Sequence, residues 1–433
     1  MKRWLAFVSV AALACGSSSS GGGPAPTAGE TLCAGVTAPC TGLASGASEK
    51  EVSTAFVTAK PGGTIVFGSG TFTFQNQLDV AQKGVTIRGQ GPDATVLDFS
   101  AQLAGSEAVS VAMSDGFAMR DLGVRDAKGD AIKVIGSKGV TFSNVKVSWT
   151  RMPASSHGPY GIYPVQCQNV LIEGCDVSGA ADSGIYVGQS EHIVVRKNHV
   201  HDNVAGIEIE NSHYADVRDN LAENNTGGIL VFALPGLQVP DCHDVRVFGN
   251  QIKNNNTPSF ADPGDVVSAV PAGTGSFVLA SDHVEIFGNT FEGNKTAQMA
   301  VISYLVTQMT FPDTYYPYPT NIYVHDNTWT NGGAMPDVKS VLGGLLSENL
   351  GLFTPPHVAD ILYDGLVDPQ KMLGPNAMNP MNICVGGLNG ATFADLHAGK
   401  TLDLVNGFPM LSQDVVPFTC TIPPVAEVTL PGM

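Results

Sequence analysis

One short motif recurs along the middle of the chain, and this repeat restricts the possible folds more than any other feature. Five segments share an isoleucine that follows Gly or Ala and precedes a hydrophobic residue by two places; these isoleucines are Ile132, Ile162, Ile185, Ile207 and Ile229. Their spacings are 30, 23, 22 and 22 residues. A period of this length is typical of solenoids, in which each repeat stacks on its neighbours.

Asparagines recur in the same register as this motif. One set ends a Val-x-hydrophobic segment, and a second set lies five residues after the first four members; the sets are Asn198, Asn220, Asn250, Asn289 and Asn327, and then Asn203, Asn225, Asn255 and Asn294. Asn tolerates the left-handed backbone conformation, and its amide can bond to the same residue of the next repeat. We therefore expect these residues at turns, stacked in ladders.

These patterns predict an all-β fold, a single-stranded right-handed parallel β-helix with coils of about 22 residues. Each coil would hold three short strands, and strands of successive coils would pair at about 4.8 Å. A leucine-rich repeat has a similar period but needs a Leu-x-x-Leu-x-Leu frame, which this sequence lacks. A β-sandwich would not keep one register through five copies.

The two ends of the repeat region predict caps. Residues 45–60 predict a short amphipathic helix that begins at Ser48 and covers the first coil. After Asn331 the repeat fades, and residues 338–349 and 358–366 are predicted short helices of an irregular C-terminal cap. The expected organisation is a signal peptide at 1–14, a lipid anchor and tether at 15–44, the β-helix with its N-terminal cap at 45–330, and the capping region at 331–433.

The first residues predict export. Lys2 and Arg3 precede an apolar run over residues 4–14, as in a secretory signal. The segment ending at Cys15 resembles a bacterial lipobox, although its Leu stands two places before the Cys instead of three, and plain secretion is the alternative. The absence of an aspartate after Cys15 favours the outer membrane or cell surface, with the periplasmic side left open. Residues 16–29 are rich in Gly, Ser and Pro and predict a flexible tether.

The charge balance excludes one class of partner. Lys and Arg number 22 and Asp and Glu 39, so the net charge is −17. Phosphate backbones need a cationic surface, so we expect no nucleic acid. Beyond the N-terminal segment, no run of 18 apolar residues predicts a membrane span, so contact with a membrane would be through the lipid anchor alone.

The region after residue 60 resembles known proteins. Residues 61–67, 70–72 and 85–89 resemble the opening coils of the pectate-lyase-like superfamily. Residues 115–310 and segments near the C-terminus are similar to a bacterial family of exported tandem β-helix proteins whose biochemical role is not established. Members of that family often neighbour a diheme c-type-cytochrome-like protein, which implies an exported protein partner.

The resemblance implies fold and export but no named activity. The Asn-Thr-Asp, Asp-Asp and Gly-His-Gly set of polygalacturonases is absent, and so is the Asp-Pro-His-Glu signature of mannuronan epimerases. The chain also lacks Cys-x-x-Cys-His, so it attaches no haem by that motif.

Seven cysteines remain once Cys15 is assigned to the lipid. In an oxidising compartment we expect two disulfides, Cys33 with Cys40 and Cys384 with Cys420. The other three are expected to be buried thiols: Cys167, Cys175 and Cys242. Cys167 and Cys242 share a column with serines, three coils apart, which is too far for a bridge.

One outward column of the predicted stack carries the candidate site. Side chains on a strand alternate in direction, so the residue between two inward hydrophobic positions points outward. The column reads Lys133, Tyr163, Tyr186, Glu208 and Leu230, with Phe277 expected next. Glu210 lies in the neighbouring outward column, Tyr160, Asp130 and Asp182 come just before the strand, and an insertion at 150–159 is expected to bring Arg151 and His157 near it.

Glu208 and Glu210 are two residues apart on a strand, so their Cα atoms lie roughly 6.6 Å apart. That separation suits acid–base chemistry or cation chelation, and calcium is left open as a cofactor. Lys133 or Arg151 would neutralise a uronate, and Tyr163 or Tyr186 would move a proton. The candidate catalytic residues are Glu208, Glu210, Tyr186, Tyr163 and Lys133, and the candidate ligand-binding residues are Tyr160, Asp182, Arg151 and His157. The competing interpretation is a set of solvated side-chain ladders.

Two functions follow from this face. The first is binding or modification of an extracellular carbohydrate, with lyase, epimerase or glycoside hydrolase chemistry if the protein is an enzyme. The second is a non-catalytic surface scaffold that docks another exported protein, such as a c-type cytochrome. Carboxylates with shifted pKa values would favour the first, and an exposed apolar patch around Leu230, Phe232 and Phe277 the second. No metal site is expected, because no third ligand is found for His199 and His201.

Overall fold

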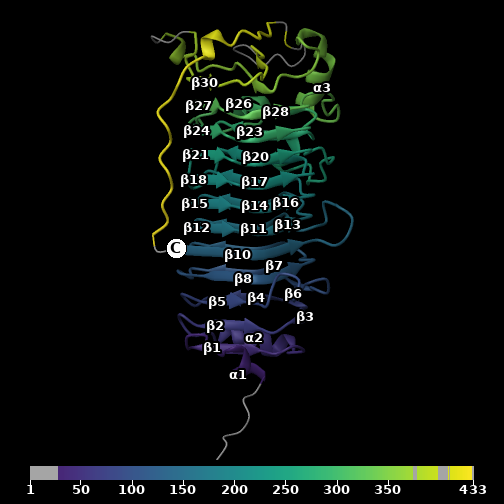
Figure 1. Ribbon diagram of the computed structural model, residues 1–433, viewed down its shortest axis with the longest axis vertical. Helices are drawn as coiled ribbons and strands as arrows, with labels where there is room; N and C mark the ends of the chain where they lie inside the picture. Colours follow the sequence, from purple (N-terminus) through teal and green to yellow (C-terminus); the bar gives the residue numbers. More distant parts are fainter. Residues whose placement is uncertain (1–27, 374–377, 398–407, 409, 432–433) are drawn as a thin grey trace, which may run out of the picture.

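The computed structural model describes residues 28–373, 378–397, 408 and 410–431. The predicted signal peptide, the lipobox Cys15 and most of the tether lie outside the described residues. The described chain winds into a parallel β-helix whose coils stack along the long axis of the molecule (Figure 1).

One sheet of the stack has eleven parallel strands and carries the predicted site. Its strands, in order from the N-terminal end, are β4 (Asn76–Val80), β7 (Ala104–Ala112), β9 (Asp130–Ile135), β11 (Tyr160–Val165), β14 (Ser183–Gly188), β17 (Ala205–Glu210), β20 (Gly227–Phe232), β23 (Thr274–Leu279), β26 (Ala297–Ile302), β29 (Ile361–Tyr363) and β31 (Phe393–Asp395). We call it the site sheet.

The other strands form two further columns. The first holds β1 (Cys40–Leu43), β2 (Thr64–Phe67), β5 (Thr86–Arg88), β8 (Ala118–Arg125), β10 (Lys138–Ser148), β12 (Gln168–Glu173), β15 (Glu191–Arg196), β18 (His213–Arg218), β21 (His243–Phe248), β24 (Asp282–Phe287), β27 (Thr320–His325) and β30 (Ile383–Gly386). The second holds β3 (Gly70–Thr73), β6 (Thr95–Asp98), β13 (Asp176–Ser178), β16 (His199–His201), β19 (Leu221–Glu223), β22 (Gln251–Lys253), β25 (Thr290–Glu292) and β28 (Thr328–Thr330). The long strands β8 and β10 pair in both columns.

The register of the stack follows the repeat. Ile132 pairs with Ile162, and Ile185 pairs with Ile207, so the isoleucines form one inward column. All five isoleucines of the motif are fully buried. Burying such a side chain stabilises the fold by about 1.5–3 kcal/mol, and the column repeats this contribution at every coil.

The asparagine ladders are confirmed, but the reason given for them is only partly correct. Asn220 Oδ1 accepts hydrogen bonds from the backbone N–H and the side-chain amide of Asn198 in the preceding coil. The left-handed backbone belongs to the residue before each ladder asparagine; Lys197 and Asp219 have φ of 56° and 57°. Asn is therefore selected at these positions because its amide satisfies buried backbone groups, and the preceding residue makes the turn.

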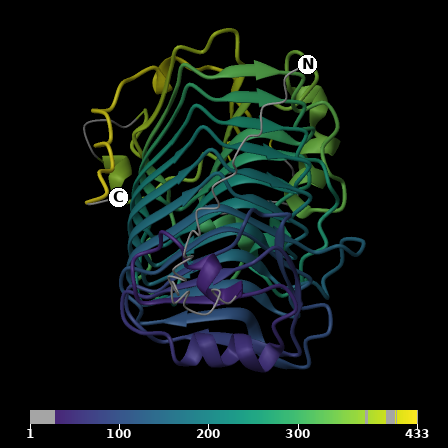
Figure 2. The ribbon, with the colours of Figure 1, turned by 60° about the horizontal axis from the view of Figure 1, so that its bottom comes forward.

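The N-terminal cap agrees with the prediction. Helix α2 (Glu49–Val57) begins after Ser48, whose side chain accepts from the N–H of Glu51 in a capping box. Val52 and Phe56 are buried, and the Phe56 ring meets Phe67 of the first column edge-on. Figure 2 looks toward this end of the stack, where α2 and the short α1 (Ala28–Leu32) lie. Strand β1 pairs with β2, so the ordered stack begins before residue 45.

The C-terminal end is more regular than the sequence predicts. Helix α3 (Val341–Glu348) lies within the predicted helix 338–349. The predicted helix 358–366 is wrong, because β29 occupies this segment and pairs with β26. The Gly-Ile motif is absent there, yet Ile361, Leu362 and Tyr363 are all buried and continue the coil. Five short 3₁₀ helices complete the described elements: η1 (Val266–Ala269), η2 (Tyr304–Thr307), η3 (Leu350–Leu352), η4 (Lys371–Leu373) and η5 (Val416–Phe418).

The last described residues return along the stack. Figure 1 shows this segment, in yellow, running beside β27, β24, β21, β18 and β15 toward the N-terminal end. The Val425 N–H donates to Glu285, 3.1 Å away, and the Val428 N–H donates to Asp216, 3.3 Å away. Within the described residues, no helix has the length and apolar character needed to cross a bilayer.

The cysteine predictions are confirmed. Disulfides join Cys33 to Cys40 and Cys384 to Cys420. The free thiols within the described residues are buried, and they are Cys167, Cys175 and Cys242. The N–H of Cys167 donates to Ser190 Oγ, and the N–H of Cys175 donates to Asn198 Oδ1, so both thiols occupy positions in side-chain ladders.

Candidate functional site

The outward face of the site sheet divides into two chemically different halves. The polar half lies on β9, β11, β14 and β17 and carries the predicted tyrosines and carboxyls. The apolar half lies on β20, β23 and β26. The outward side chains change from polar to apolar between two adjacent coils, because Glu208 pairs with Leu230 and Glu210 pairs with Phe232.

Three tyrosine rings form a compact group on the polar half. The Tyr160 ring centroid lies 4.5 Å from that of Tyr163 and 4.6 Å from that of Tyr186. The centroids of Tyr163 and Tyr186 are 4.9 Å apart, with the rings nearly perpendicular. Tyr160 and Tyr163 are partly exposed, whereas Tyr186 is 5% exposed. The group therefore has an accessible edge and a buried interior, and offset ring pairs of this kind stabilise the arrangement.

Gly188 permits the position of Tyr186. A Cβ atom on Gly188 would lie 2.6 Å from the Tyr186 hydroxyl oxygen and 2.4 Å from its Cε1 atom. The ring of Tyr186 thus occupies the space over Gly188, and its hydroxyl donates to Glu210 Oε1 at 2.5 Å.

Three carboxyls converge behind the tyrosines. Ser183 Oγ lies 2.8 Å from Asp182 Oδ1 and 2.5 Å from Glu208 Oε2. A serine hydroxyl has one hydrogen to donate, so it cannot donate to two ionised carboxylates at once. At least one of these acids must hold a proton.

Burial explains this proton. Burial raises the pKa of Asp182 to about 7, against the opposing Ser183 hydrogen bond. Burial also raises the pKa of Glu208 well above its usual range, and the charges of Asp182 and Glu210 raise it further. Burial raises the pKa of Glu210 as well, against the opposing Tyr186 hydrogen bond. At neutral pH the cluster therefore holds protons that isolated carboxylates would have lost.

The tyrosines donate protons in hydrogen bonds but do not lose them. Burial, with added repulsion from nearby carboxylates, raises the pKa of Tyr160 and of Tyr186 far above the ordinary value. Burial raises the pKa of Tyr163 to about 12. This makes a tyrosinate base at neutral pH unfavourable, so a proton-moving role for Tyr163 or Tyr186 would be that of a donor.

Lys133 is already paired at the accessible edge. Its Nζ lies 3.4 Å from Glu107 Oε1 and 3.7 Å from Asp130 Oδ2, and 4.9 Å from the centroid of the Tyr163 ring. Burial raises the pKa of Asp130 to about 6 despite this ammonium group. The lysine therefore faces two carboxyls of its own protein, so it is poorly placed to attract a uronate.

Sequence reasoning missed Glu107 and Ser183. Glu107 lies on β7 and pairs with Asp130, but the Gly-Ile motif begins one coil later. Alternation within residues 104–112 is the signal that would have placed Glu107 on this face. Ser183 is the first residue of β14 and directly precedes the glycine of the motif.

Arg151 and His157 make their contacts elsewhere. The His157 ring stacks on Trp149 with centroids 6.1 Å apart, and its Nδ1 lies 2.7 Å from the Gly179 carbonyl oxygen. Arg151 is exposed and lines a separate pocket with Trp149 and Asp126. The insertion at 150–159 thus uses His157 for packing at a corner of the stack.

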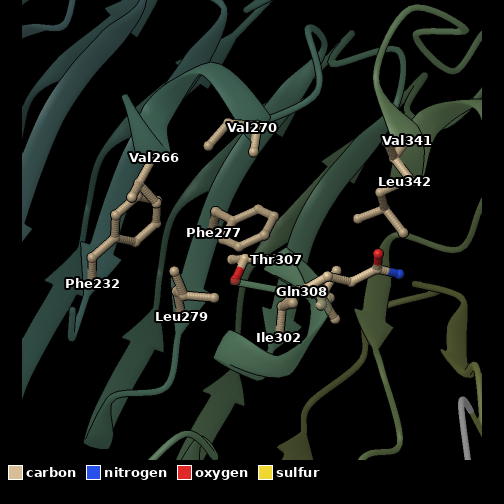
Figure 3. Close-up of a pocket in the computed structure, with 12 residues that line it drawn as sticks. Phe232, Val266, Val270, Phe277, Leu279, Ile302, Thr307, Gln308, Val341 and Leu342 are labelled. Atoms are coloured by element: carbon tan, nitrogen blue, oxygen red, sulfur yellow. The ribbon is translucent and has the colours of Figure 1, made fainter. Parts of the chain in front are cut away.

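Insertions cover the apolar half. Figure 3 shows Phe232, Phe277, Leu279 and Ile302 projecting from the sheet toward Val266 and Val270 near η1, Thr307 and Gln308 near η2, and Leu342 of α3. These residues enclose a pocket of about 130 Å³. Leu230, Phe232 and Phe277 are buried, so the exposed apolar patch that would have favoured a docking scaffold is absent at these residues.

A group of side chains that could bind a metal ion lies outside the polar half. The carboxyls of Asp182 and Glu208 in the polar half have raised pKa values and are linked through Ser183. These contacts do not test whether calcium binds there. On the neighbouring column, however, Asp176 lies beside His199 and His201. The candidate for a third ligand that the sequence analysis did not find is Asp176, on the preceding coil.

Comparison with solved structures finds β-helical proteins of low sequence identity. The A-module of mannuronan C-5 epimerase AlgE4 from Azotobacter vinelandii is 16% identical, with 73% of this chain and 87% of that chain covered and a TM-score of 0.46. A GH136 lacto-N-biosidase from Eubacterium ramulus is 13% identical, with 68% and 65% covered and a TM-score of 0.48. An exopolygalacturonase from Thermotoga maritima is 12% identical, with 66% and 76% covered and a TM-score of 0.45. Values this low carry no inference about the activity of this chain.

A search of curated proteins finds no match. The family model for the right handed beta helix region matches residues 83–234 and 130–316, which together span more than half of the chain. These matches cover the strands from β5 to β26 and include both halves of the site sheet. The chain therefore belongs to the right-handed β-helix family, as its repeat predicted.

Proposed function

We propose that the polar half of the site sheet binds an extracellular glycan, and that the glycan is neutral. The observation that carries the proposal is the partly exposed edge of the tyrosine group, where the Lys133 ammonium, paired with the carboxyls of Asp130 and Glu107, lies over the Tyr163 ring. Donors and acceptors at one edge of an aromatic group suit a ligand with many hydroxyls. The pairing of Lys133 with two carboxyls disfavours an anionic sugar.

The geometry supports binding more strongly than glycosidic hydrolysis. Paired carboxyls of glycoside hydrolases stand about 5 Å or more apart, with the scissile bond between them. Glu208 and Glu210 are instead almost fully buried, and they bond to Ser183 and Tyr186 of their own protein. Modification of the bound glycan would need Asp182 or Glu208 to reach the ligand as a general acid, which is the finer part of this proposal.

A glycan array tests the proposal. The soluble chain from Thr27 is screened with and without calcium, beside the Tyr163→Ala/Tyr186→Ala double variant and Lys133→Met. We expect binding to neutral glycans that the double variant loses and that Lys133→Met weakens roughly tenfold, as for a lost hydrogen bond to a charged group. Lys138→Met is the matched control, because Lys138 is an exposed lysine on β10, outside the site sheet.

Two results would contradict this function. Binding that the double variant retains would move the site off the polar half, and no binding to any glycan would reject the carbohydrate assignment for the ligands tested. Pull-down experiments would then test an exported protein partner, including a c-type cytochrome. Incubating a bound glycan with the protein and recording its NMR spectrum separates binding from cleavage or epimerisation.

We also propose that the protein is exported and held at the outer membrane or cell surface by a lipid on Cys15. The support is the sequence of the first fifteen residues, with its basic start, apolar run and cysteine. Cys15→Ser should move the protein from the membrane fraction to the soluble fraction and abolish labelling by a radioactive fatty acid. A protein that stays in the membrane fraction without label would overturn the anchor.

A further inference from the structure

Two histidines and an aspartate meet on the second column of the stack. Asp176 on β13 pairs in register with His199 on β16. The Nδ1 atom of His199 lies 3.3 Å from Asp176 Oδ2, and the Nε2 atom of His201 lies 3.7 Å from Asp176 Oδ1. One ligand atom from each of the three residues lies within 4.8 Å of the others. The middle residues of these short strands, Val177 and Val200, point into the core, so the three polar side chains share the outer face.

The far nitrogen of each imidazole has its own carboxylate. His199 Nε2 lies 3.0 Å from Glu223 Oε1 on β19, and His201 Nδ1 lies 2.7 Å from Asp202 Oδ2. In a neutral imidazole the nitrogen that bonds to the carboxylate carries the hydrogen, and the other nitrogen keeps a lone pair. Both lone pairs then face Asp176. This outer carboxylate is the feature that orients metal-binding histidines in proteins.

We propose that Asp176, His199 and His201 bind a divalent transition-metal ion, with Zn²⁺ the first choice. Two imidazole nitrogens and one carboxylate oxygen form a ligand set that zinc accepts, with a further position left for water or an outside ligand. The side chains are 37%, 25% and 40% exposed for His199, His201 and Asp176, so solvent reaches the site. The ion would connect two adjacent coils on a face distinct from the site sheet, so this site is independent of the glycan proposal.

A second histidine cluster provides an internal comparison. His213 and His243 stack with ring centroids 3.9 Å apart, and His213 Nε2 lies 2.9 Å from Asp241 Oδ1. His243 Nδ1 lies 2.7 Å from Asp244, which leaves one nitrogen for a metal. In the contacts described for His213, Asp241 is the carboxylate partner, and no second carboxylate orients the other nitrogen. We therefore assign the tighter site to Asp176, His199 and His201.

Zinc competition with a chromophoric chelator tests the assignment on the full chain after metal removal. The reference protein carries His213→Gln and His243→Gln, so that the second cluster cannot contribute. We expect it to bind one Zn²⁺. Adding Asp176→Asn and His201→Gln should weaken the affinity by at least ~100-fold, and adding Glu223→Gln instead should weaken it by ~10-fold, the range known for outer carboxylates.

The controls keep the result decisive. His192→Asn removes another partly exposed histidine and should leave the affinity unchanged. All variants should melt at the same temperature without metal, since the changed side chains are near-isosteric and half-exposed. Co²⁺ in place of Zn²⁺ should give a visible absorption spectrum that Asp176→Asn/His201→Gln removes. The proposal is overturned if the reference protein binds no Zn²⁺, or if Asp176→Asn/His201→Gln leaves its affinity as it was, in which case the cluster is a network of ion pairs.

Discussion

The polar and apolar halves of the site sheet share one backbone but differ in what covers them. Both halves continue the same coil, with an inward column that is isoleucine up to Ile229 and then Ser276 and Met299. The asparagine ladders that begin at Asn198 and Asn203 run beside part of the polar half and all of the apolar half. On the polar half, Glu208 and Glu210 are buried among tyrosines and other carboxyls. On the apolar half, Leu230 and Phe232 occupy the equivalent positions under η1, η2 and α3.

This difference shows that in a solenoid the inward side chains, which hold the fold together, can be conserved in character while the outward side chains change. The inward columns set the stability and register of every coil, so the outward columns can change completely between neighbouring coils. Burial has opposite consequences on the two halves. It stabilises the aliphatic and aromatic side chains, whereas it raises the pKa of the carboxyls and makes them retain protons.

The largest effect is expected when an acid is placed on the wrong half. Leu230→Glu puts a carboxyl among apolar side chains, and Leu230 is fully buried. An unpartnered buried acid should lower the free energy of unfolding by about 3–5 kcal/mol. The reverse change, Glu208→Leu, removes a carboxyl that already holds a proton and loses its hydrogen bond with Ser183, so it should cost only about 1–2 kcal/mol. Urea unfolding measures both, and a similar loss for the two variants would mean that the halves are not chemically distinct.

The pH dependence of stability should come in part from the polar half. An acid whose pKa is raised in the folded state binds more protons when folded, so stability falls as the pH rises from the unfolded pKa to the folded one. For Asp182 this window runs from the ordinary pKa of 3.8 to about 7. Between pH 5 and pH 8, wild-type protein should lose about 2–3 kcal/mol more stability than Asp182→Asn.

Thermal melts at several pH values measure this difference. Asn is close to Asp in shape and can still accept from Ser183, so the variant removes the titration with little change in packing. Asp364→Asn gives the same comparison for an acid outside the polar half, because burial also raises the pKa of Asp364 to about 7. Equal pH slopes for wild type and Asp182→Asn would show that the acid stays ionised throughout this range.

Replacing either of two glycines by alanine should change the free energy of unfolding by an intermediate amount. Gly188→Ala places a Cβ atom 2.6 Å from the Tyr186 hydroxyl oxygen and should cost about 1–3 kcal/mol while displacing the ring from Glu210. Gly227→Ala on the apolar half meets Leu230 at 3.2 Å and Val270 at 3.3 Å, and should cost less than about 1 kcal/mol. Urea unfolding compares the two, and equal costs would argue against the tight seat of Tyr186.

The smallest effect is expected inside the stack. Cys167 and Cys242 occupy one inward-facing column, which also includes Ser190 and Ser212. Cys167 belongs to a coil of the polar half and Cys242 to a coil of the apolar half. Replacing either cysteine by serine supplies the hydroxyl already used in that column, so each change should alter stability by less than about 1 kcal/mol. Thermal melts of both variants check this, and a large loss for one of them would show that the scaffold itself differs between the halves.

Much of the fold could be predicted because its determinants are local and repeated. The isoleucine spacing, the asparagine ladders and the pairing of Cys384 with Cys420 all appear in the structure. The exact C-terminal boundary could not be predicted, because β29 and β31 are strands of three residues that lack the Gly-Ile motif. Alternation over three residues is too short a signal to separate a strand from a helix.

Some of the residues that form the polar half could be predicted from the sequence. The column of Lys133, Tyr163, Tyr186 and Glu208 follows directly from strand alternation and a constant coil. The burial of Glu208 and Glu210 could not be read from that pattern, because it depends on how the insertions and neighbouring rings fold over the sheet. The same reasoning explains the missed contact of Asp176 with His199, which are 23 residues apart in sequence yet adjacent on paired strands.

The sequence was sufficient for the coil, its register and its direction of pairing, since one period repeats the same hydrophobic and amide contacts at every step. Folding in three dimensions set the chemical state of the outward side chains. Protonation depends on solvent access and on nearby charges, and both come from segments that are distant in the chain. For that reason Glu208 was recognisable as a candidate from its position, but its proton is a property of the folded protein.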